Sequence, residues 1–238
     1  QHGLAVEDVA FAWTFTTQSV TLDLELIRKG LYGHGPFARL DAEFEETLSL
    51  YPIRSGEFSG SQYIIPGEDM GPLTNFIAST FNLGGGIVDS MTESYDYVSH
   101  VVMGRYNAPN FMVNKEGLGT PDYPVDDDES FYINTHTGEA VYGVGEVPFV
   151  CAIPKAINGY KQPFPVVLHT SGTGIPKIGA LGYAGYFARF GLATCAIDAY
   201  AHGFFVAGNG GLSDDVLQAA LEGLGFGQGL EAFLSGRA

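Results

Sequence analysis

Residues 165–203 read PVVLHTSGTGIPKIGALGYAGYFARFGLATCAIDAYAHG, and this stretch decides the fold. It predicts an apolar strand over residues 165–169, a glycine-rich loop over 170–174, a helix over 178–190 and a second apolar strand over 192–198. A strand, a helix and a second strand in this order form a βαβ unit, whose strands are parallel and buried on both faces. The sequence therefore predicts α/β structure for this part of the chain.

Apolar runs bounded by turn-forming residues predict four more strands before this unit, at residues 9–16, 97–106, 131–134 and 147–153. Asn107–Asn110 is predicted to turn the chain after the second of these strands, and the Thr137–Gly138 region is predicted to join the last two. We therefore expect a leading β-rich region over residues 1–145 and a second part over residues 146–238 that contains the βαβ unit.

One helix is predicted in the leading region. Thr17 or Ser19 can cap its start, and Gly30 and Gly33 are predicted to end it. Residues 34–94 carry glycine and proline at short intervals, which predicts turns and short strands in that stretch.

The composition excludes several classes of function. Eleven Lys and Arg residues against 27 Asp and Glu residues give a formal net charge of -16 over 238 residues, which repels phosphate backbones and anionic headgroups. Nucleic acid is therefore not an expected partner. No apolar run approaches the roughly 20 residues that cross a bilayer, so no transmembrane segment is expected.

Low lysine content, 33 glycines and the strong acidity are typical of an extracellular protein. Residues 1–20 lack the charged-then-apolar pattern of a signal peptide, so any targeting segment is expected to have been removed.

Cys151 and Cys195 are the only two cysteines, and their spacing fits neither a CxxC redox pair nor a zinc site. Both lie in predicted strands. Two buried free thiols are the favoured interpretation, and a single disulfide is the alternative, which a secreted protein would favour.

The loop Ser171–Gly174 follows a strand and precedes a helix, so its backbone N–H groups face a place where negative charge can be held. A phosphate-binding P-loop would need GxxxxGK[ST], which is absent. Gly172 and Gly174 match the first two glycines of the dinucleotide fingerprint GxGxxG, but Lys177 stands at the third position. Asp198 ends the next strand where a ribose-binding carboxylate would lie, so a dinucleotide-binding domain is an alternative.

Residues 147–203, which include IPK, PFPVVLHTSGTG and FGLATCAIDAYAHG, resemble the opening of the α/β-hydrolase fold. Residues 11–19, FAWTFTTQS, and residues 104–111, GRYNAPNF, resemble the leader region of large bacterial extracellular lipases and esterases. The resemblance implies a serine carboxylic-ester hydrolase with an ester substrate, secreted or held in the bacterial cell envelope.

In the α/β-hydrolase fold, the loop after the third strand donates a backbone N–H to the oxyanion of the tetrahedral intermediate. The resemblance gives this role to the backbone of Thr173, with Gly172 beside it, and assigns Ser171 and Gly174 to the substrate loop. The family has His-Gly before the donor, whereas this chain has Ser171 and Gly172. A structural turn without a ligand is the alternative interpretation of this loop.

The resemblance also implies that Asp198 satisfies backbone donors and is not the acid of a catalytic triad. His202 comes too early to be the catalytic base, because the order in this fold is Ser, then Asp or Glu, then His. The chain lacks Gly-x-Ser-x-Gly, and the nearest stretch, residues 211–215, lacks the final glycine. We therefore expect this chain alone to be inactive, with the triad on a following segment or a companion fragment of the same polypeptide.

The family topology places the 147–153 strand beside the 192–198 strand, with the 165–169 strand on the other side of the latter. Cys151 and Cys195 would then lie on neighbouring strands. With so few strands, the 192–197 side is expected to be open, and the companion fragment would complete the sheet.

Metal binding is a minor expectation. His169 is expected to be a core or loop histidine and not a metal ligand. Four consecutive acidic residues have the hard oxygen ligands that Ca²⁺ prefers, although a solvated turn is favoured because their spacing matches no EF-hand. They are Asp126, Asp127, Asp128 and Glu129. Apart from this possible structural Ca²⁺, no cofactor is expected. A non-catalytic secreted binding or structural module is the main alternative to an enzyme.

Overall fold

The computed structural model describes residues 21–45, 48–51, 63–80, 82–112, 131–170 and 176–199. The chain divides into two compact units. One comprises Gln1–Glu43 and Tyr132–Ala140, and the other comprises Phe44–Phe131 and Val141–Ala238. The boundary predicted between residues 145 and 146 falls inside the strand β4 (Gly143–Pro154), and the division into a leading part and a hydrolase part stays a prediction.

The first unit contains the helices α1 (Leu22–Gly30) and α2 (Leu40–Glu43). The predicted helix is confirmed where it is described, with Gly30 as its last residue; Thr17 and Ser19 lie outside the described residues. A β-carbon on Gly30 would lie 2.6 Å from the Phe37 carbonyl oxygen, so this helix end needs a glycine.

A tight turn at residues 134–139 completes the first unit. The Asn134 backbone N–H donates to the Glu139 carbonyl at 2.7 Å, and Gly138 has the positive φ of 76° that favours glycine. The predicted Thr137–Gly138 turn is therefore confirmed. The strand predicted over residues 131–134 is wrong, because only one bridge forms there, between Ile133 and Ala140.

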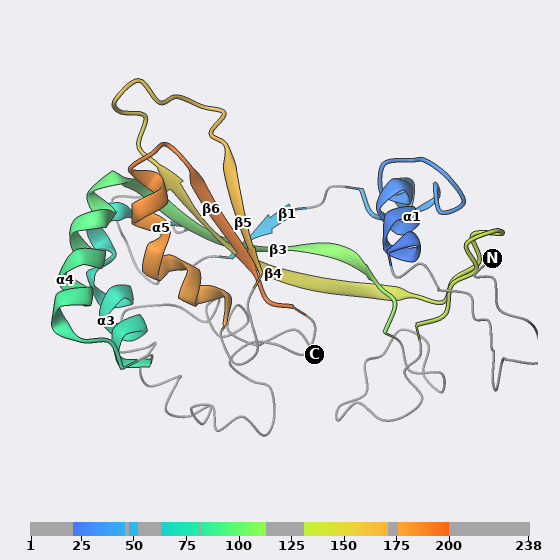
Figure 1. Ribbon diagram of the computed structural model, residues 1–238, viewed down its shortest axis with the longest axis horizontal. Coiled ribbons are helices and arrows are strands. Elements are labelled where there is room, and N and C mark those ends of the chain that lie inside the picture. The colour runs from blue at the N-terminus through green and yellow to red at the C-terminus, as the bar shows by residue number, and fades with distance from the viewer. Residues whose placement is uncertain are drawn as a thin grey trace, which may run out of the picture. The chain divides into compact units, whose positions relative to one another are not determined.

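Among the described residues, the second unit is built on a six-stranded mixed sheet with the order β1-β3-β4-β6-β5 (Figure 1). The sixth strand, β2, pairs with β3. Its strands are β1 (Leu48–Leu50), β2 (Ile64–Pro66), β3 (Val98–Asn110), β4, β5 (Val166–Thr170) and β6 (Ala193–Ile197). β5 and β6 are parallel, and every other pair is antiparallel. The helices and this sheet confirm an α/β fold.

The predicted βαβ unit is present as β5, the 3-10 helix η4 (Lys177–Ala180), α5 (Leu181–Ala188) and β6. β6 lies between β4 and β5, which confirms the predicted neighbours. The expected open side at residues 192–197 is wrong, because β6 is paired on both sides. Within the βαβ unit, β5 is the strand at the open edge, and β1 lies at the other end of the described strand order.

The prediction that both strands of this unit are buried on both faces is wrong for β5. Val166 and Leu168 on this strand are 53% and 80% exposed. A strand at the edge of a sheet has a neighbour on one side only, so its apolar side chains pack less completely.

Two stretches of the leading region also differ from the prediction. β3 continues through Asn107–Asn110, because β4 supplies backbone partners as far as the Asn110–Gly143 pair, and this pairing overrides the local turn preference. Residues 67–97 hold helices in place of turns and short strands. These are η2 (Gly67–Asp69), α3 (Gly71–Thr80), α4 (Gly85–Ser94) and η3 (Tyr95–Tyr97). Several of the glycines taken as turn signals begin helices, so the leading region has more than one helix.

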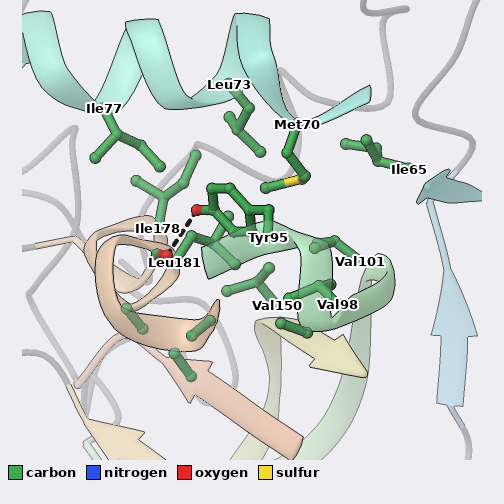
Figure 2. Packing of buried hydrophobic residues seen from close by; sticks show 14 of the residues in the cluster. Ile65, Met70, Leu73, Ile77, Tyr95, Val98, Val101, Val150, Ile178 and Leu181 are labelled. Carbon is green, nitrogen blue, oxygen red and sulfur yellow. Dashed lines mark hydrogen bonds between the residues drawn. The ribbon is translucent and has the colours of Figure 1, made fainter. Parts of the chain in front are cut away.

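The core of the second unit lies between one face of the sheet and the helices α3, α4 and α5 (Figure 2). The strands contribute Val101, Met103, Val150, Ala152 and Ala196, which the pairing registers place on the same face. The Tyr95 hydroxyl crosses this core and donates to the Leu181 carbonyl at 2.6 Å. This hydrogen bond fixes the start of α5 over the sheet.

Candidate functional site

The expected site residues Ser171, Gly172, Thr173 and Gly174 lie outside the described residues. The same holds for His202 and for the acidic stretch 126–129. What the structure describes is the frame that flanks the loop on both sides, at the carboxyl ends of two neighbouring parallel strands.

This frame begins at the pair formed by Thr170 and Ile197, the last residues of β5 and β6. Chain leaving the carboxyl ends of parallel strands forms the binding crevice in open α/β sheets. The loop after Thr170 leads to Pro176 and to η4, so its two ends are held beside the end of β6.

A buried ion pair secures the second end of the loop. The Lys177 backbone N–H donates to Asp198 Oδ1 at 2.6 Å, and Lys177 Nζ donates to Asp198 Oδ2 at 2.6 Å. The two side chains are 2% and 0% exposed. The structure confirms that Asp198 satisfies a backbone donor, because its carboxylate accepts the Lys177 N–H. That Asp198 is not the acid of a triad stays a prediction.

Burial lowers the pKa of Lys177, and the neighbouring Asp198 carboxylate opposes that shift by stabilising the ammonium form. Sequence reasoning missed this partner, because a lysine at the start of a helix is ordinarily solvated. The apolar residues around Lys177 in the sequence could have indicated that its side chain is buried and needs a charged partner.

The same contacts bear on the dinucleotide alternative. A ribose-binding carboxylate must be open to the ligand, whereas Asp198 is buried and both of its oxygens accept hydrogen bonds from Lys177. Lys177, which occupies the third glycine position of the fingerprint, is buried as well. The geometry around Asp198 disfavours this alternative.

No family model, curated protein or solved structure matches this chain. The resemblance to α/β-hydrolases therefore stays a prediction that rests on the residues quoted above. Within the described residues, every helix is too short or too polar to span a bilayer.

His169 lies on β5 and packs against an aromatic cluster on α5. Its ring meets Tyr183 edge-on at 5.5 Å between centroids, and Tyr183 meets Phe187 in the same way at 5.7 Å. In the part of the chain that the structure describes, no three His, Cys, Asp or Glu side chains come together as metal ligands. Burial raises the pKa of Tyr183, and its hydroxyl has no hydrogen-bond partner among the described residues.

Cys151 and Cys195 form a disulfide, so the favoured interpretation as free thiols is wrong. The two residues are directly opposite each other in the β4–β6 pair, and their α-carbons lie 4.1 Å apart. Spacing in the sequence carried no information about this register. The bond ties β6 of the βαβ unit covalently to the long β3–β4 ribbon.

An open cavity of about 340 Å³ lies between α4, η3 and α5. Its lining carries charges of both signs, from Glu93, Asp96 and Arg189. Ser90 and Tyr186 in the lining are hydrogen-bonded to each other. Sequence reasoning missed this cavity, because α4 and η3 come from a stretch predicted as turns and strands. None of the predicted site residues lines it.

Proposed function

We propose that this chain supplies the scaffold and the oxyanion-hole loop of a serine carboxylic-ester hydrolase of the α/β-hydrolase type. The observation that carries the proposal is the frame at the carboxyl ends of β5 and β6. There the loop 171–175 leaves one parallel strand and returns to Lys177, whose amide is held by Asp198 at the end of the other. Oxyanion stabilisation requires preorganised N–H groups, and anchoring both ends of a loop reduces the number of conformations that it can adopt.

In this proposal, the Thr173 backbone N–H donates to the oxyanion that develops as the ester carbonyl is attacked. Gly172 and Gly174 have no side chains, so the substrate can approach the backbone closely. Ser171 and Gly174 border the bound substrate. The chain itself does not supply the nucleophile, the base or the acid, and it is inactive alone.

The triad of Ser, Asp or Glu, and His belongs to a following segment or to a companion fragment of the same polypeptide. The position of β5 at an edge of the described sheet supports this assignment, because its outer backbone groups can pair with a further strand. Such a strand would bring the nucleophile beside the Thr173 amide.

A secreted or cell-envelope location in a bacterium fits the proposal. The Cys151–Cys195 disulfide is the bond expected in an oxidising compartment, and the net charge of -16 keeps the protein away from nucleic acids. For Asp126, Asp127, Asp128 and Glu129, a solvated acidic turn stays the favoured interpretation and a structural Ca²⁺ the alternative.

A serine-reactive phosphonate applied to the intact protein tests the reaction class. We expect the label on the following segment or companion fragment and none on this chain. Lack of labelling on any polypeptide that co-purifies with this chain would contradict the proposal. It would favour the non-catalytic secreted module, which keeps the βαβ core without catalysis.

The role of Thr173 is tested by Thr173→Pro, which removes the amide N–H, with Thr173→Ser as the control that keeps it. Losing one oxyanion donor lowers kcat by about 10²–10³-fold, so we expect this loss in the proline variant only. Equal ester hydrolysis by both variants would remove Thr173 from the site.

A shift of the melting temperature with a nicotinamide dinucleotide would instead support the dinucleotide alternative.

A further inference from the structure

The open cavity between α4, η3 and α5 has the size of a small-molecule site. Its volume is about 340 Å³, at the lower end of the range of about 300–1,000 Å³ that such sites cover. α4 and α5 lie side by side (Figure 1). Residues three apart on a helix share a face, which brings both Ser90 and Glu93 of α4 into the lining. The cavity therefore collects polar groups from two helices and from the turn between α4 and β3.

The two acidic residues of the lining have no counterion. Glu93 lies in the last turn of α4, where the carbonyl ends of the helix carry partial negative charge, and Asp96 follows three residues later in η3. Within the part of the chain that the structure describes, neither carboxylate forms an ion pair. Both side chains are exposed, so a cation from solvent can reach them.

Arg189 lines the same cavity but does not neutralise these carboxylates. Its guanidinium lies over the Tyr97 ring, with Cζ 5.7 Å from the ring centroid. This attraction holds the guanidinium in place and occupies none of its five N–H donors in a conventional hydrogen bond. No carboxylate among the described residues pairs with it. The lining thus offers a positioned cation to an anionic group of a ligand.

Ser90 and Tyr186 add a further donor. Their hydroxyls are hydrogen-bonded to each other. Such a pair has two O–H protons and uses one of them, so the second is available to a ligand. Tyr186 precedes Arg189 by three residues, which puts this donor and the guanidinium on the same face of α5.

We propose that this cavity binds a free basic amino acid such as L-lysine. The ligand carboxylate accepts hydrogen bonds from Arg189 and from the hydroxyl pair, and its two ammonium groups face Glu93 and Asp96. The charges match, because lysine carries two positive groups and one negative group, which is the complement of the lining. A divalent cation alone matches less well, since Arg189 repels it.

Isothermal titration calorimetry of the full chain tests this assignment. The ligands are L-lysine and cadaverine, which has two ammonium groups and no carboxylate. We expect lysine to bind more tightly than cadaverine. Arg189→Gln should weaken lysine binding about tenfold, because it removes a charge-assisted hydrogen bond, and it should not weaken cadaverine binding. Glu93→Gln should weaken the binding of both ligands.

Asp89→Asn is the matched control. It removes an exposed carboxylate from the same helix, outside the lining, and should leave the affinity for lysine unchanged. Lysine that does not bind, or that binds no more tightly than cadaverine, would overturn the proposal. Binding of Ca²⁺ in place of lysine, abolished by Glu93→Gln, would assign the cavity to a metal ion and would also overturn it. None of these residues belongs to the 171–175 loop, so the result is independent of the hydrolase proposal.

Discussion

At the scale of single residues, the buried pair of Lys177 and Asp198 is the strongest electrostatic feature of the candidate site. Two hydrogen bonds, from the Lys177 backbone N–H and from Lys177 Nζ to the Asp198 carboxylate, join the start of η4 to the residue after β6. Breaking such a pair leaves one buried charge without a counterion, which is costly because water cannot reach it.

We predict that Asp198→Asn lowers the free energy of unfolding by about 3–5 kcal/mol, because it leaves the Lys177 ammonium buried without a carboxylate. Urea denaturation measures this loss. The double variant Lys177→Met with Asp198→Asn should be more stable than the single one, since no charge then remains in the interior. A double variant that is less stable than Asp198→Asn would contradict this account.

The buried Tyr95 hydroxyl is expected to lower the free energy of unfolding at alkaline pH. Burial raises the pKa of Tyr95 above its ordinary value of 10.0, whereas the unfolded chain ionises near that value. Above about pH 10 the unfolded state therefore binds fewer protons than the native state, and stability falls by about 1.4 kcal/mol per pH unit for each such tyrosine. The lowered pKa of Lys177 acts in the opposite sense below its ordinary value of 10.5.

Tyr95→Phe isolates the contribution of this tyrosine. The variant should be about 1 kcal/mol less stable at neutral pH, because the hydrogen bond to the Leu181 carbonyl is lost. Its stability should then fall less steeply than that of the unsubstituted protein from about pH 9 to about pH 11. Parallel curves over that range would show that Tyr95 is not the titrating group.

At the scale of elements, close packing of α5 against the end of α4 depends on a glycine. A β-carbon on Gly185 would overlap Ser94, whose own β-carbon would lie 2.7 Å away. The corresponding atom on Gly182 of the same helix would meet only the end of the Met91 side chain, at 3.8 Å. Close packing therefore requires a glycine at position 185 of α5 but not at position 182.

We predict that Gly185→Ala destabilises the protein by about 1–3 kcal/mol, because the helix must move away from Ser94. Gly182→Ala is the control and should be neutral or stabilising by up to about 1 kcal/mol, since alanine favours a helix. Thermal unfolding of both variants separates overlap from helix propensity. Equal effects of the two substitutions would show that the α4–α5 contact tolerates a methyl group.

At the scale of the whole molecule, the disulfide closes a loop with a sequence separation of 44 residues. In the chain-entropy model a loop of this length stabilises the folded state by about 4 kcal/mol, because the unfolded chain has fewer conformations.

We predict that Cys151→Ala with Cys195→Ala lowers the free energy of unfolding by about 4 kcal/mol. Either single substitution should cost a similar amount, since each removes the whole bond. Guanidinium denaturation of the three variants measures this, and adding a reductant to the unsubstituted protein should reproduce the loss. A double variant as stable as the unsubstituted protein would show that the β4–β6 pairing alone holds the two strands together.

The sequence by itself determined the local elements whose signals are short-range. The βαβ unit was predictable because apolar runs at 165–169 and 192–198 flank a helix. The helix α1 was predictable because glycines mark its end. The structural role of Asp198 followed from the resemblance, since its position just after a strand is part of that pattern.

Tertiary structure alone decided the features that join residues far apart in the chain. The Cys151–Cys195 bond depends on the β4–β6 register. The buried Lys177 depends on its ion pair with Asp198, a residue 21 positions further along the chain that the fold brings beside it. The helices α3 and α4 form where glycines suggested turns, because packing on the sheet outweighs weak local preferences. Long-range pairing decides such features, and a single sequence carries no local signal for it.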